Sequence, residues 1–266
     1  MTFLQVCVLF VAAILGGTLN SVAGGGSFIT FPALLFTGVL PINANATSTV
    51  ALWPGSVAST GAYREELAKQ DRTRLFVLGG TSLIGGVLGA VLLLRTSQTT
   101  FVRLVPYLLL VATLLFTFSA PIMDRVRKRK AEETSKVEER KQARSSWLGL
   151  AGIALLQLVI SVYGGYFGGG IGILMLATLS LMGMENIHEM NALKTLLTSF
   201  INGVAVITFI IAGAVVWVPA ILMVVGAIIG GYGGAYFARQ IDPRWVRIFV
   251  ILVGVGMTIY FFFVYG

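Results

Sequence analysis

The chain has 266 residues, of which 56% are apolar and 11% charged, and its formal net charge is +8. Soluble domains average about 25% charged residues, so this composition excludes an ordinary soluble protein. It favours a helical membrane protein with several spans, each of which needs about 20 apolar residues. The basic excess lies in loops and no base-reading motif accompanies it, which argues against nucleic-acid binding.

The first half predicts four membrane-spanning helices, the first of which is broken. An apolar run from Phe3 to Ser21 stops at Gly24–Gly26 and resumes as a half-helix from Phe28 to Phe36. Three glycines in succession weaken a helix, and we expect an unwound turn there. A turn is expected at 41–43, and the following spans are expected at 45–63, 75–94 and 104–120.

The second half repeats this pattern after a charged segment, residues 124–144. Its broken span starts near Trp147, with a half-helix at 173–182, and further spans are expected at 187–212, 217–238 and 246–264. Matched motifs keep a shift of about 145 residues. We therefore predict an all-α polytopic protein of eight transmembrane helices, in two parallel four-helix repeats. The repeats cover 1–120 and 147–266, a charged cytoplasmic linker covers 121–146, and a Gly-broken helix opens each repeat.

Basic residues in alternate loops predict the orientation in the membrane. With the N-terminus inside, the cytoplasmic loops 64–74 and 124–144 carry thirteen Lys and Arg residues, and the remaining six lie elsewhere. Cytoplasmic loops are enriched in these residues, so both termini are expected in the cytoplasm of a bacterial inner membrane. The sequence leaves open whether the broken segments cross fully or are re-entrant.

The two glycine breaks predict an anion site. A broken helix exposes backbone N–H groups at a new helix N-terminus, where the helix dipole attracts anions. Inside a membrane such breaks occur where the backbone lines protein or a wet cavity. Helix packing through small residues is the alternative role for these glycines. The expected binding residues of the breaks are Gly24, Gly25, Gly26, Ser27, Gly168, Gly169 and Gly170.

A polar cluster follows each break and opens the next span. Amides and hydroxyls are costly against lipid, so these side chains face either a ligand or other helices, which they would hold by hydrogen bonds. Lys194 stands where the first copy has Ser48, and a cation there suits an anionic substrate. The expected binding residues are Asn45, Thr47, Ser48, Thr49, Asn191, Lys194 and Thr195. Ser56, Thr198 and Asn202 continue the same helix faces.

His188 and Glu189 are candidates for proton coupling. A histidine titrates near neutral pH, while Glu189 also fits a capping box with Asn186. No catalytic motif, nucleotide-binding loop, cofactor motif or metal-ligand cluster is found, so we predict that the protein is not an enzyme and that it binds no cofactor or metal.

At these residues the chain resembles the sulfite exporter TauE/SafE family of membrane permeases. The resemblance lies in Asn20–Ser27, Pro32, Asn43–Thr49, Gly168–Gly170, Asn191–Thr195 and the glycine-rich pair of C-terminal spans, and only 124–144 departs from it. It implies an inner-membrane transporter for sulfite, sulfoacetate or other organosulfonates.

We therefore predict a secondary transporter of a small sulfur-containing anion, with protons as a possible coupling ion, membrane lipid as its surroundings and a homodimer as a possible assembly. A membrane scaffold or assembly subunit and an anion channel remain alternatives. The exact anion and the direction of transport stay open.

Overall fold

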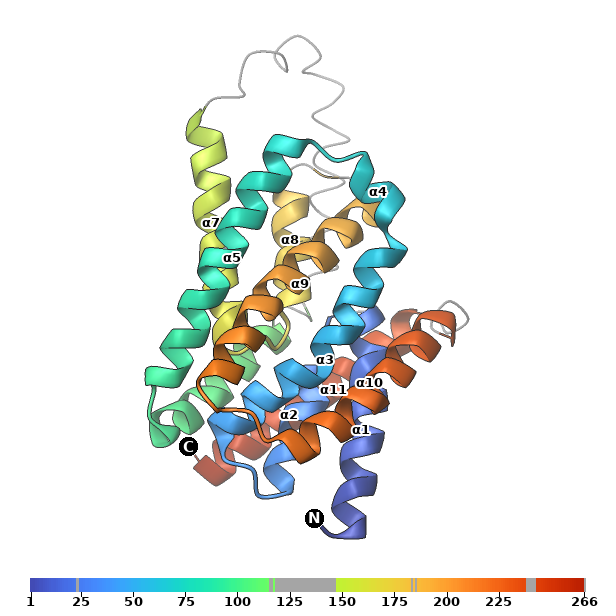
Figure 1. The fold of residues 1–266 in the computed structure, drawn as a ribbon, viewed down its shortest axis with the longest axis vertical. Coiled ribbons are helices and arrows are strands. Elements are labelled where there is room, and N and C mark those ends of the chain that lie inside the picture. The colour runs from blue at the N-terminus through green and yellow to red at the C-terminus, as the bar shows by residue number, and fades with distance from the viewer. Residues whose placement is uncertain are drawn as a thin grey trace.

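The computed structural model describes residues 1–22, 24–114, 117, 147–182, 184, 186–237 and 243–265. All regular structure in this part of the chain is α-helix. Figure 1 shows the helices in one elongated bundle, with both termini at its lower end and the short helix α4 near the opposite end. The charged segment 124–144 lies outside the described residues.

The first break produces a helical hairpin. Helix α1 (Phe3–Val22) ends just before the glycines, and α2 (Ser27–Phe36) begins just after them. The side chain of Gln5 donates a hydrogen bond of 3.4 Å to the Thr37 carbonyl. Because Gln5 lies near the start of α1 and Thr37 follows the end of α2, α2 runs back alongside α1. The first break therefore folds the chain back on itself.

Helix α3 (Pro41–Ala62) begins earlier than expected. Proline occupies its first turn, where the missing N–H costs nothing, so the predicted turn at 41–43 is wrong. The chain turns at Thr37–Leu40 instead, where Gly38 has a φ of 87°.

The rest of the first half is helical up to the linker. Asp71 caps α5 (Arg72–Arg95) by accepting a hydrogen bond of 3.1 Å from the backbone N–H of Thr73. Helix α4 (Arg64–Ala68) precedes this cap, and a further apolar helix, Gln98–Leu114, follows α5.

The second half contains a matching hairpin. Helix α7 (Trp147–Tyr166) and α8 (Ile171–Leu181) flank the second break. A β-carbon added at Gly164, near the end of α7, would collide with the side chain of Ile171 at the start of α8. Further from the break, the Gln157 amide lies 4.0 Å from the Met175 sulfur. Helix α8 thus also folds back. Helices α9 (Ile187–Ile211), α10 (Trp217–Phe237) and α11 (Pro243–Tyr265) follow.

Glycine faces join the two halves. Helix α1 packs on α10 and α5 packs on α7. A β-carbon at Gly230 would collide with the backbone of Ile14, and one at Gly89 would lie 2.7 Å from the Tyr166 nitrogen. Small residues allow helices in a membrane to approach this closely. Gly89 and Gly230 therefore serve close helix packing between the two halves.

Cross-helix contacts fix the direction of each helix. Asn43 bonds to the Ala214 carbonyl before α10, and Gly55 lies near Ala227 within it, so α3 and α10 run in the same direction. Thr60, near the end of α3, bonds to Ser199 in the middle of α9, whereas Gly203, further along α9, lies against Trp53, earlier in α3. These two helices therefore run in opposite senses.

As Figure 1 shows, α1 and α7 begin at opposite ends of the bundle. The two halves therefore run antiparallel, and the predicted parallel relation does not fit the structure. The physical reason is the fold-back of α2 and α8, which adds one reversal of direction to each half.

Three described helices are long and apolar enough to cross a membrane, at Phe3–Asn20, Arg72–Arg95 and Glu189–Ile211. The shorter apolar helices are Ser27–Phe36, Gln98–Leu114, Gly152–Tyr166, Trp217–Gly233 and Ile251–Phe263. A total of eight spans stays a prediction.

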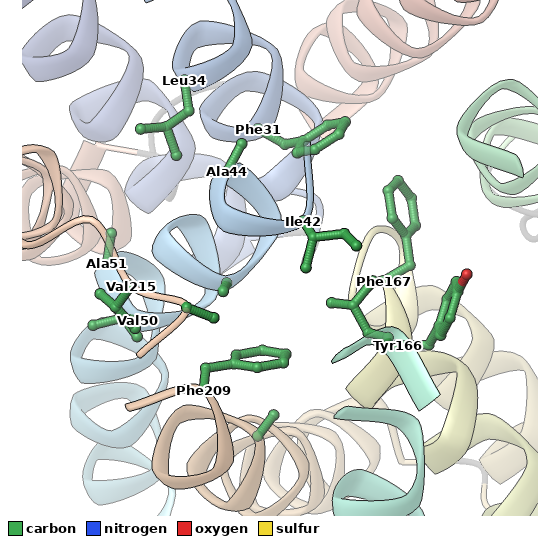
Figure 2. Close-up of a cluster of buried hydrophobic side chains, with 14 of the residues drawn as sticks. Phe31, Leu34, Ile42, Ala44, Val50, Ala51, Tyr166, Phe167, Phe209 and Val215 are labelled. Carbon is green, nitrogen blue, oxygen red and sulfur yellow. The ribbon is translucent and has the colours of Figure 1, made fainter. Parts of the chain in front are cut away.

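An aromatic cluster closes the bundle at the end where the termini lie. The ring centroid of Phe31 is 6.2 Å from that of Phe101, 5.9 Å from Phe167 and 6.0 Å from Phe261. Figure 2 shows Ile42 pointing from α3 toward Phe167 within the same cluster. Edge-to-face aromatic pairs stabilise such a core beyond their burial.

A second apolar cluster lies toward the α4 end of the bundle. Its members come from the beginning of α5, from α7 and α8, and from the first half of α9; they are Leu78, Ile160, Ile171, Met175, Leu179, Met190, Leu193, Leu197 and Ile201. Apolar side chains thus flank the broken region toward both ends of the bundle.

Candidate anion-binding site

The two glycine breaks meet inside the bundle. A β-carbon added at Gly24 would lie 3.0 Å from the Cα atom of Gly172. Gly24, Gly168 and Gly170 have φ angles of 75°, 74° and 74°, a conformation that glycine adopts at little cost. The start of α2 and the start of α8 therefore come together from opposite halves of the chain.

Each break leaves backbone donors available. Among the described residues, Gly25, Gly26 and Ser27 donate no backbone N–H to a backbone carbonyl, and neither do Gly169 and Gly170. These groups precede or open α2 and α8, where the helix dipole also favours negative charge. The breaks can thus offer N–H groups to an anion.

Polar side chains of α3 are occupied by contacts within the protein. Asn45, 2% exposed, donates a hydrogen bond of 3.1 Å to the Tyr166 carbonyl. The Ser48 and Thr30 hydroxyls lie 2.6 Å apart. These two residues act as interhelical ties, which is the alternative role that the sequence left open.

Two threonines of α3 are also engaged. The Thr47 hydroxyl accepts a hydrogen bond of 3.0 Å from the backbone N–H of Val216. The Thr49 hydroxyl donates over 2.9 Å to the Asn45 carbonyl of its own helix. Neither hydroxyl is left without a partner.

Helix α9 differs from α3. The Thr195 hydroxyl donates over 2.9 Å to the Asn191 carbonyl, but no described residue bonds to the Asn191 side-chain amide. Lys194 is 3% exposed, and no hydrogen bond or ion pair joins its ammonium to the described residues. A buried cation without a partner is costly, so an anion at this position would stabilise the protein.

Further unpartnered groups lie on α9 and on α7. Thr198 Oγ1 and Asn202 Oδ1 on α9, and Gln157 Oε1 on α7, are buried without a hydrogen-bond partner among the described residues. The sequence analysis placed Thr198 and Asn202 on the polar face but did not select them as binding residues. It overlooked Gln157, whose signal was a lone amide within an apolar span.

Comparison with known proteins shows the family of this chain. The family described as "Sulfite exporter TauE/SafE" matches residues 9–261. The chain belongs to the TauE/SafE family. It is accordingly a membrane transporter and not an enzyme.

Curated relatives of this TauE/SafE protein are bacterial. It is 29% identical to a "Probable membrane transporter protein" of Haemophilus influenzae over 252 residues, 94% of this chain and 92% of the relative. It is 27% identical to the "Probable membrane transporter protein YfcA" of Escherichia coli K12, over 94% of this chain and 87% of the relative. A "Probable membrane transporter protein ORF9" of Sinorhizobium is 26% identical, over 97% of this chain and 93% of the relative. No solved structure matches the chain.

The candidates for proton coupling lie in the first turn of α9. The Glu189 carboxylate accepts hydrogen bonds from the side-chain amides of Gln70, over 3.3 Å, and Asn186, over 3.4 Å. The contact with Asn186 joins the two side chains, whereas a capping box joins each side chain to a backbone N–H, so the capping box stays a prediction. The side chain of His188 lies outside the described part of this transporter, and a role in coupling stays a prediction for both residues.

The described residues contain no group of three or more His, Cys, Asp or Glu that could hold a metal ion. The polar groups of the breaks and of the helices that follow them are therefore backbone N–H groups, hydroxyls, amides and one ammonium, all of which can bind an anion.

Proposed function

We propose that this TauE/SafE protein is a secondary carrier of a small sulfur-containing anion such as sulfite, sulfoacetate or another organosulfonate. The observation that carries the proposal is Lys194, a buried cation without a described partner on the helix that follows the second break. The family description, sulfite exporter, supports the substrate class.

The binding residues would come from both halves. The backbone N–H groups of Gly25–Ser27 and Gly169–Gly170 stand at converging helix starts. Discontinuous helices with N-termini directed at an anionic group are a recurring design of transporter sites. Lys194 would supply the compensating charge, and the interhelical ties of Asn45 and Ser48 would hold the two breaks in place.

Thermal unfolding of the purified full-length protein in detergent tests this proposal. Sulfite, sulfoacetate, thiosulfate, sulfate, phosphate and chloride would be compared. An anion at 100 times its Kd stabilises a folded protein by about 2.7 kcal/mol, a measurable rise in Tm. We expect Lys194→Met to abolish the rise and the charge-matched control Lys69→Met, at an exposed site, to retain it.

Other outcomes separate the alternatives. A rise that persists in Lys194→Met would place the anion elsewhere. No rise with any anion would favour a membrane scaffold or assembly subunit. Counterflow of labelled anion into loaded vesicles would identify a carrier, because a channel does not couple efflux to influx in this way.

The observed helix directions also change the orientation that we propose. Loop 64–74, with four basic residues, joins α3 to α5 at the α4 end of the bundle. Helix α7 begins at the same end, directly after the nine basic residues of 124–144. Helix α10 runs with α3, so α11, which carries Arg244 and Arg247 in its first two turns, begins at that end. The opposite end has two, Arg95 and Arg103.

Six described basic residues thus belong to the α4 face, and nine more directly precede α7 in the sequence. Arg95 and Arg103 belong to the other face, and Lys194 lies within α9. Basic residues beside spans favour the cytoplasmic side. We therefore propose that the α4 face is cytoplasmic in a bacterial inner membrane and that both termini lie outside. This reverses the orientation expected from the sequence, which assumed that the broken helix crosses the membrane. Proton coupling and a homodimer stay proposals without a supporting contact.

A further inference from the structure

One face of α9 carries three polar side chains at intervals of four residues: Lys194, Thr198 and Asn202. Residues four apart share a helix face, and a rise of 1.5 Å per residue spreads the three over about 12 Å. Ile207 and Ile211 are 57% and 82% exposed. Ile207 follows Thr198 by nine residues, and Ile211 follows Asn202 by the same number. Nine residues rotate a helix to about its opposite side, so the polar face points away from the lipid side.

This polar face lacks internal hydrogen bonds. Lys194 is 3% and Thr198 is 9% exposed. Thr198 Oγ1 and Asn202 Oδ1 have no partner among the described residues, and the Lys194 ammonium has none there either. Buried polar groups in native proteins are nearly always satisfied, and two successive exceptions on one face, next to a buried lysine, indicate that a ligand or water satisfies them.

The corresponding face of α3 is satisfied. With the shift of 146 that aligns Asn45 with Asn191, the three residues correspond to Ser48, Leu52 and Ser56. Ser48 pairs with Thr30, and Ser56 accepts a hydrogen bond of 2.9 Å from the Asn20 amide. Leu52 is apolar and 4% exposed. Of these two helix faces, only that of α9 therefore has unused polar groups among the described residues, although the two helices begin with matching motifs.

We propose that Thr198 and Asn202 are further anion-binding residues and extend the Lys194 site along α9. The Thr198 hydroxyl and the Asn202 amide can each donate to an anion oxygen, since the two ends of an amide exchange by rotation. Donors on successive turns favour an anion with several oxygen acceptors over a halide. This inference rests on the proposed function and adds two side-chain donors from the second half of the protein to the site.

Calorimetric titration of the full-length protein in detergent tests the proposal, with sulfite as the probe and chloride as a competitor. The variants are Thr198→Val and Asn202→Leu, and the matched control is Ser56→Ala, at the position that corresponds to Asn202. A hydrogen bond to a charged group contributes about 1.5–3 kcal/mol, so we expect each α9 variant to lose at least about tenfold in sulfite affinity. Competition by chloride should change by much less.

The Tm of the unliganded protein provides the second readout. Thr198→Val removes an unpartnered hydroxyl and should leave this Tm unchanged or raise it. Ser56→Ala loses its hydrogen bond with Asn20, so it should lower the Tm while sulfite affinity stays the same. Wild-type affinity in both α9 variants would overturn the inference, as would a fall in their unliganded Tm to match that of Ser56→Ala. If the wild-type protein binds no sulfite while it binds another of the six anions, that anion replaces sulfite as the probe. If it binds none of them, the proposed function fails first.

Discussion

The side-chain amide of Asn45 donates a hydrogen bond to the backbone carbonyl of Tyr166, and thereby ties α3 of the first half to the end of α7 in the second. Tyr166 is the last residue before the second break, where the helix can no longer satisfy its own carbonyls. The polar motif that follows the first break thus satisfies a backbone carbonyl beside the second break.

Asn45→Ala should destabilise the protein. The substitution leaves the buried Tyr166 carbonyl without its donor, which costs about 1–3 kcal/mol. Thermal unfolding in detergent would show a lower Tm, and Asn45→Asp should lower it further, because a carboxylate faces the carbonyl oxygen. The exposed Thr99→Ala serves as the control. An unchanged Tm in both Asn45 variants would contradict the observed contact.

Gly24→Ala and Gly38→Ala should separate backbone strain from contact between the breaks. Both glycines have positive φ, 75° and 87°, so alanine at either position should cost about 1–2 kcal/mol. Only Gly24 lies against Gly172, while a β-carbon at Gly38 meets no atom within 4 Å. We expect similar losses of Tm but a loss of sulfite binding in Gly24→Ala alone. Equal binding in both variants would argue that the contact of the breaks is not needed for the anion.

Two glycines of α5 should respond to alanine with opposite signs. At Gly80 a β-carbon meets nothing within 4 Å, whereas at Gly89 it would lie 2.7 Å from the Tyr166 nitrogen. Alanine favours a helix over glycine by up to about 1 kcal/mol, so Gly80→Ala should raise the Tm, and Gly89→Ala should lower it by forcing α5 from α7. The same sign at both positions would mean that α5 and α7 do not pack in this way.

Labelling of intact cells tests the orientation. In a Cys7→Ser background, which removes the single native cysteine, a cysteine placed at the C-terminus should react with a membrane-impermeant maleimide. A cysteine in place of Lys69, in the loop at the α4 face, should react only after lysis. The reverse pattern would restore the orientation that the sequence alone suggested.

The helices themselves could be predicted from local chemistry. Runs of uncharged residues located most spans, and the glycine triplets located the breaks, because both effects act within a few residues. The start of α3 was misplaced, since Pro41 was interpreted as part of a turn when it occupies the first turn of the helix. Proline is compatible with both, and the local sequence does not choose between them.

The fold-back of α2 could not be predicted, because it depends on distant contacts. The bond from Gln5 to Thr37 and the packing of Thr30 on Gly16 join residues whose proximity no local pattern encodes. The same limit applies to the polar clusters. The motifs identified both Asn45 and Lys194, but only the packing shows that Asn45 has a partner in the opposite half while Lys194 has none among the described residues.

The antiparallel halves bear on the direction of transport. Each hairpin enters the bundle from the opposite face, so an arrangement in which one half opens toward its face has a counterpart in which the other half opens toward the other. If the carrier alternates between two such states, the fold itself imposes no direction of transport. Net flow, import or export, would then be set by the anion and any coupled-ion gradients across the membrane, and one protein could serve a cell for uptake under scarcity and for detoxification under excess.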